Sequence, residues 1–245
     1  MKLKNRALKR SFIATLMAGS LLVSFVPAMA QEQTWHDWST MTLMDGEKYG
    51  IYPLSWYDDM QTKMDGKTLQ TYCEAIGKKL EAISGVKLKE TPDELAYITE
   101  EVTRGKVLES IYKVLNQYTY PSDVNLGDDA ITYMRENQIV MGTGKDLNLD
   151  KVCTLEEAAT FGTRIINVFY KNLNAGSKGL LWKVEKDGNT IYMLGSIHLA
   201  NYGAYPFSHK ILEAYEASDV LGVELNFYDT EGIKYFSDIA CYSDG

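Results

Sequence analysis

The sequence predicts an α+β protein in which an all-α module of helical repeats, residues 31–175, precedes an α/β region, residues 176–245, that begins with a β-hairpin and a βαβ unit. Two observations predict this order. Amphipathic runs with helical spacing fill most of the first region, whereas short apolar runs flank an Asp-Gly pair in the second. The stretch 171–178 contains Asn-Ala-Gly-Ser, a composition typical of a linker, and we place the boundary there.

The first thirty residues have the organisation of a secretory signal peptide. A basic start is followed by the apolar run 12–26 and by the small-residue site Ala28-Met29-Ala30. We therefore expect cleavage after Ala30 and a secreted or cell-envelope location. The alternative is an uncleaved anchor, but the apolar run is short for a span of about 20 residues. No other segment of the sequence is apolar enough to cross a membrane.

Charge and cysteine content exclude several kinds of protein. Loss of the five basic residues of the signal peptide changes the formal net charge from −8 to −13. A surface this acidic argues against nucleic acid or anionic lipid as a partner. The three cysteines, Cys73, Cys153 and Cys241, are too scattered for a disulfide framework or a C-x-x-C zinc site. A bridge between Cys73 and Cys153 and two buried free thiols both remain open.

Three predicted helices of the first region resemble one another. They begin near Lys67, Val102 and Cys153, and each opens with a threonine followed by an amphipathic run. Each threonine is a candidate N-cap, and Glu157 completes a capping-box pattern after Thr154. Similar units at this scale indicate an array of repeats.

These units resemble S-layer homology repeats. The match is best from Ile131 to Ile166, Met44–Ile83 is similar to a weaker copy, and Glu101–Gly105 has the Thr-Arg pair of the family signature. The resemblance implies that Arg104 holds an anionic cell-wall polysaccharide. Leu69 and Leu155 occupy the corresponding positions of the other two units. A packing or spacer module with ordinary N-caps is the alternative interpretation.

An aromatic-rich segment begins this region and raises a related possibility. Aromatic rings can stack on sugar rings, but at this density they more often belong to a core or an interface. The segment contains Trp35, Trp38, Tyr49, Tyr52, Trp56 and Tyr57.

In the second region, residues 180–184 and 189–194 predict two strands joined by Asp187-Gly188, residue types that a tight turn with positive φ requires. A helix over 208–217 and a buried strand over 220–225 follow. Strand, helix and strand predict a right-handed parallel crossover, which would bring His198 and Glu224 to one edge of the sheet.

Imidazole and carboxylate ligands suit Zn²⁺, Mn²⁺ or Co²⁺, although a catalytic site needs about three protein ligands. A hydrogen-bonded structural histidine is the alternative for His198. Glu224 is costly to bury in an apolar strand unless it is paired, protonated or metal-bound. His209 is interpreted as a solvated or capping residue, and His36 has no evident partner in the sequence.

The segment LLWKVEKDGNTIYMLGSIHLANYGAYPFSHKILEAYEASDVLGVELN, which starts at Leu180, resembles the first part of the TraB/GumN family, which includes the Tiki metalloproteases. The resemblance implies a metal-dependent peptidase or hydrolase that uses a divalent metal such as Mn, Co or Zn and acts on a peptide or protein. It places His198, of the G-x-x-H motif, and Glu224 in the active site. It also implies a second G-x-x-H motif, which this sequence lacks, so we expect a fragment or a truncated domain. The alternative is a non-catalytic envelope protein.

Overall fold

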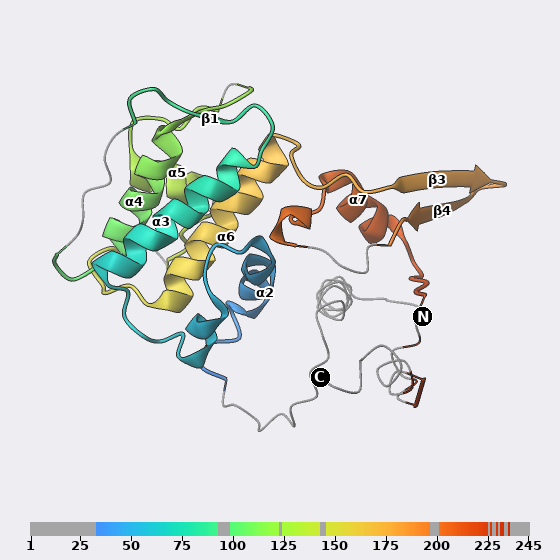
Figure 1. Ribbon diagram of the computed structural model, residues 1–245, viewed down its shortest axis with the longest axis horizontal. Coiled ribbons are helices and arrows are strands. Elements are labelled where there is room, and N and C mark those ends of the chain that lie inside the picture. The colour runs from blue at the N-terminus through green and yellow to red at the C-terminus, as the bar shows by residue number, and fades with distance from the viewer. Residues whose placement is uncertain are drawn as a thin grey trace, which may run out of the picture.

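The computed structural model describes residues 33–92, 99–122, 124–142, 146–196 and 201–224, together with 226, 229, 231, 232 and 235. The described residues form a mixed α+β structure that is mostly helical, as predicted at that level (Figure 1). The elements are α2 (Thr40–Tyr49), η1 (Leu54–Asp58), α3 (Gly66–Glu81), β1 (Lys87–Leu88), α4 (Arg104–Asn116), β2 (Tyr118–Thr119), α5 (Ala130–Glu136), α6 (Leu155–Asn172), β3 (Leu181–Lys186), β4 (Asn189–Leu194), η2 (Tyr202–Ala204) and α7 (His209–Ala217).

Side-chain caps fix where the long helices begin. Thr103 caps α4 and Thr154 caps α6, and a complete capping box joins Thr154 to Glu157, as predicted. The expectation for α3 was wrong, because Asp65 is its N-cap and accepts hydrogen bonds from both the amide and the hydroxyl of Thr68. A carboxylate is favoured at this position because it satisfies free amides and complements the positive end of the helix dipole.

The starts of α3, α4 and α6 meet through backbone pairing. Lys63 forms an antiparallel bridge with Thr154, and Thr103 forms one with Val152. Cys153 lies between the two bridges: its carbonyl accepts from Met64 N and its amide donates to Val102 O, each at 2.9 Å. The segment before α6 is therefore held on both sides. The three similar helix starts share one location, whereas repetition of whole units stays a prediction.

The helical core lies between α6 and the helices around it, with α2, α3 and α4 all packing against α6. Ile76, Leu108, Ile111 and Ile165 are fully buried. The buried residues of α3 and α4 form one apolar face on each helix, whereas α6 is buried over most of its circumference. Burying such a side chain contributes about 2 kcal/mol. Gly162 permits close approach of α3 and α6, since a Cβ there would lie 1.9 Å from the Tyr72 hydroxyl oxygen.

The predicted hairpin is confirmed. β3 and β4 pair antiparallel from Leu181↔Leu194 to Lys186↔Asn189, and the turn residues Asp187 and Gly188 have φ of 50° and 77°. The hairpin extends away from the helices, with α7 near its base (Figure 1). Its apolar side chains are exposed; those of Trp182, Val184, Ile191 and Met193 are about half exposed or more.

The predicted strand over 220–225 is absent from residues 220–224, which contain no strand beyond an isolated bridge residue. The predicted βαβ unit is therefore not formed in the described part of the chain, although its helix is present as α7. An apolar run is buried as a strand only when a sheet supplies hydrogen-bonding neighbours and covered faces. The described sheets have two strands each, and Val220 is 54% exposed.

Within the described ranges, no helix combines the length and apolar character needed to cross a membrane. The predicted signal peptide, residues 1–30, lies outside these ranges. The predicted linker spans residues 171–178. Its first residues belong to the end of α6, and Ser177, close to its other end, forms a parallel bridge with Phe207.

Candidate functional site

The structure describes one of the two predicted metal-site residues, Glu224, but not the other, His198. Gly195 and Ser196 follow β4 directly, but His198 lies outside the described residues. Glu224 is described and exposed, in contrast to the buried position expected for it. The convergence of the two side chains therefore stays a prediction.

No group of three or more His, Cys, Asp or Glu side chains is arranged to hold a metal ion in the described part of the chain. Cys73 and Cys153 are buried free thiols, which is the second of the two alternatives above. Burial raises the pKa of the Cys73 thiol to about 12 and that of Cys153 further. Both remain protonated at neutral pH and are poor metal ligands. Cys241 lies outside the described residues.

Arg104 points into the protein. Its Nη1 donates to Glu157 Oε1 at 2.5 Å and its Nε donates to Leu147 O at 3.1 Å. The guanidinium also lies 5.2 Å from the ring centroid of Phe161, and the side chain is only 9% exposed. The ion pair joins the start of α4 to the capping-box glutamate of α6. A wall polysaccharide, the predicted ligand of Arg104, would meet little of this side chain.

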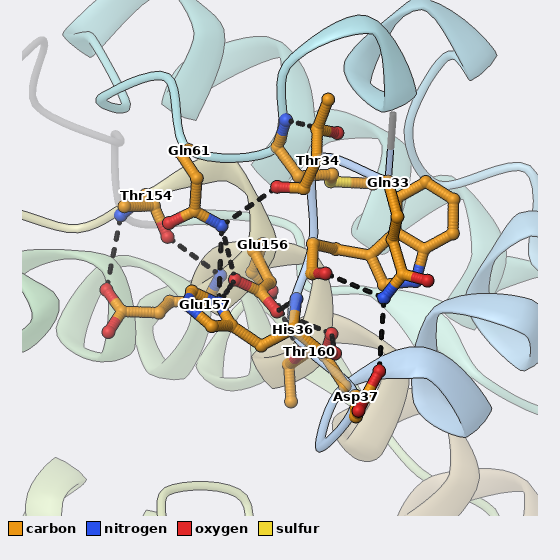
Figure 2. Close-up of polar contacts among 12 residues, drawn as sticks. Gln33, Thr34, His36, Asp37, Gln61, Thr154, Glu156, Glu157 and Thr160 are labelled. Carbon is orange, nitrogen blue, oxygen red and sulfur yellow. Dashed lines mark hydrogen bonds and ion pairs between the residues drawn. The ribbon is translucent and has the colours of Figure 1, made fainter. Parts of the chain in front are cut away.

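The strongest polar cluster is centred on Glu156, in the first turn of α6 (Figure 2). This carboxylate is 1% exposed and accepts hydrogen bonds from three residues of other segments. His36 donates its backbone amide at 2.8 Å and contacts the other oxygen through Nδ1 at 2.7 Å. Ser39 Oγ and Gln61 Nε2 complete the set at 2.5 and 2.7 Å.

These contacts determine the charge of the cluster. Burial alone would raise the pKa of Glu156, but the hydrogen bonds from Ser39, His36 and Gln61 lower it below its usual range. The carboxylate is therefore ionised at neutral pH and fixes the segment before α2 to the start of α6. Nδ1 of His36 faces the carboxylate while the side chain as a whole is 62% exposed.

A shallow hollow of about 370 Å³ lies beside this cluster. Its lining is polar and aromatic and comes from Gln33, Thr34, Trp35, His36, Asp59 and Gln61. Trp38 stacks on the His36 ring, with centroids 6.4 Å apart, and is 55% exposed. Tyr49, Tyr52 and Trp56 are instead buried, so most of the aromatic-rich segment belongs to the core.

The expectation that His36 has no partner was wrong. Its partner is 120 positions away, and no local pattern connects them. Glu156 gave no signal of its own, because beside Glu157 it looks like an ordinary first-turn acid. His209 agrees with its interpretation: it begins α7, is 49% exposed on its side chain and contacts Glu213 at 3.2 Å.

Comparison with known proteins bears on the second region. No curated protein and no solved structure matches the chain. The comparisons give no support to the S-layer homology resemblance of residues 31–175, which stays a prediction. Residues 180–245, which include the hairpin, His198 and Glu224, match the model of the TraB/PrgY/gumN family.

Proposed function

We propose that this protein is an exported cell-envelope protein in which a helical domain precedes a metal-dependent peptidase or hydrolase region of the TraB/GumN type. The observation that carries the proposal is the family match over 180–245, which contains the G-x-x-H motif. The basic and apolar first 30 residues support export. A peptide or protein is the proposed substrate.

In this proposal His198 and Glu224 are ligands of a divalent Mn, Co or Zn ion and contribute to catalysis. Imidazole nitrogen and carboxylate oxygen are suitable ligands for these metals. Such an ion would supply an activated water molecule. Two residues are fewer than the usual three protein ligands, and the family resemblance implies that others come from a second G-x-x-H motif, which residues 180–245 do not contain.

A second candidate function is non-catalytic binding of cell-wall polysaccharide by the helical domain. The observation that favours it is the meeting of three similar helix starts at one place, which is compatible with the resemblance to S-layer homology repeats. Arg104 is the predicted contact. Since Glu157 engages its guanidinium, any contribution to wall binding would be small or indirect.

Metal titration tests the first candidate. We expect residues 31–245 to bind Mn²⁺, Co²⁺ or Zn²⁺ weakly and to show no measurable peptidase activity, because the two proposed ligands, His198 and Glu224, are fewer than the about three that a catalytic site needs. Binding should be lost in His198→Ala. The matched control is His209→Ala, which removes a half-exposed histidine from α7 and should leave binding unchanged.

Equal binding by wild type and His198→Ala would exclude His198 as a ligand. Metal-dependent peptide cleavage that is lost in His198→Ala would instead show that the chain carries a complete site. Sedimentation of the protein with purified cell walls tests the second candidate: binding by the wild type supports it, and absence of binding contradicts it. Undiminished binding by Arg104→Ala would show that a surface other than Arg104 is responsible.

A further inference from the structure

The amine of Lys79 joins the two regions of the chain. Lys79 lies near the end of α3 and is 7% exposed, although it is charged in its ordinary state. Its Nζ donates to the backbone carbonyls of Tyr202 and Tyr205, at 2.6 Å each. It also lies 5.7 Å from the ring centroids of Tyr49, in α2, and Tyr170, in α6. Residues of three helices thus surround a cation that binds the segment after the G-x-x-H motif.

Contacts of a different kind hold the same segment. The turn η2, drawn in orange, lies beside α2 (Figure 1), and the Tyr202 ring occupies the space that a side chain at Gly50 would need, since a Cβ there would lie 2.6 Å from the ring. Further along, Ser177 N donates to Pro206 O and Ser208 N donates to Ser177 O, at 2.9 Å each. Residues 202–208 are therefore docked at more than one point.

The chemistry of the amine indicates what it contributes. Burial lowers the pKa of Lys79 to about 8, so burying its charge has a cost. Charge-assisted hydrogen bonds to two carbonyls and the faces of two aromatic rings offset that cost. If the side chain served only to pack the helices, an apolar residue of similar length would do so without the cost. The two hydrogen bonds to residues 202 and 205 are what an apolar residue could not provide.

We infer that Lys79 is a positioning residue through which the helical domain docks residues 202–205 of the C-terminal region. The chain between β4 and this docked turn contains His198. Lys79 therefore sets one end of the segment that carries the predicted ligand. The effect of Lys79 on a metal site rests on the proposed function, whereas the docking of residues 202–205 does not.

Amide hydrogen exchange on residues 31–245 tests the docking. In Lys79→Met we expect the amides of Ser177 and Ser208 to exchange about tenfold faster or more, which corresponds to about 1.4 kcal/mol of lost local stability. The urea midpoint of the helical core should stay the same or rise, because a buried amine has been replaced by an apolar side chain. A purely structural role would instead lower both the protection of these amides from exchange and the urea midpoint. The matched control is Lys78→Met, on the same helix, where the lysine is exposed and neither readout should change.

A second variant keeps the test independent of the stability of α3. Tyr202→Ala removes the ring that packs on Gly50 while the backbone carbonyl remains, and it should also accelerate exchange at Ser177 and Ser208. Unchanged exchange at both amides in Lys79→Met would overturn the inference, and acceleration in Tyr202→Ala alone would assign the docking to the ring on Gly50 rather than to Lys79. Neither readout involves metal, so failure of the proposed hydrolase function would appear in the His198→Ala titration and leave this result untouched.

Discussion

The helical region and the hairpin region use apolar residues in opposite ways. In the helical region they meet in one core, where side chains such as Ile76 and Leu108 are completely buried. In the hairpin, the apolar pairs Trp182↔Met193 and Val184↔Ile191 are largely exposed. Backbone pairing thus defines the hairpin, while side-chain burial stabilises the helices. The comparison shows that apolar side chains stabilise a core where a second layer covers them, and form an exposed surface where no layer covers them.

The largest expected effect on the free energy of unfolding compares a buried apolar side chain of the helical region with an exposed one of the hairpin. Ile111→Ala removes a fully buried side chain and should lower the free energy of unfolding by about 3 kcal/mol through lost burial and a new cavity. The matched substitution Ile191→Ala, on the hairpin, removes a side chain that is 61% exposed and should change it by less than about 0.5 kcal/mol. Urea denaturation measures both. Comparable losses would show that the hairpin is covered in solution.

A smaller effect on the free energy of unfolding is expected for the polar cluster centred on Glu156. Glu156→Gln should lower the free energy of unfolding by about 1–2 kcal/mol at pH 7, because Gln61, Ser39 and His36 lose charge-assisted acceptors. Since the folded-state pKa is lowered, the contribution of Glu156 is present above its unfolded pKa and is lost as the pH falls through the folded value. Wild type and variant should therefore converge in acid. Glu74→Gln, at an exposed position of α3, is the control, and a pH-independent difference would contradict the assignment.

The smallest effect should be confined to the hairpin. Gly188 has φ of 77°, and Gly188→Ala strains this turn by about 1 kcal/mol. We expect weaker cross-strand contacts between Val184 and Ile191 by NMR, with no shift in the urea midpoint of the helices. A shift comparable to that of Ile111→Ala would mean that the hairpin and the helical core unfold as one unit.

Local patterns predicted the elements that depend on neighbouring residues. The Thr103 and Thr154 caps and the Asp187-Gly188 turn are recognisable because their physical cause lies within a few positions. The first cap of α3 was misplaced because both Asp65 and Thr68 are good capping residues, and only the geometry decides between them.

Features that depend on distant partners could not be predicted in the same way. The expected strand from Val220 fails in the described residues because strand formation depends on a neighbouring strand. The contact of His36 with Glu156 spans 120 positions, and that of Lys79 with Tyr202 spans 123. Neither pair has a local signature. The candidate metal site remains a prediction from the family resemblance.

The bridge between Ser177 and Phe207 has a topological consequence. Because Ser177 and Phe207 are neighbours, the chain between them forms a closed loop that begins and ends at the same place. The entropy cost of closing a loop grows only with the logarithm of its length, so a change in the length of this loop alters that cost slightly. The hairpin β3–β4 can therefore differ in length at little entropic cost, provided that Tyr202 and Tyr205, whose carbonyls accept hydrogen bonds from Lys79, are kept.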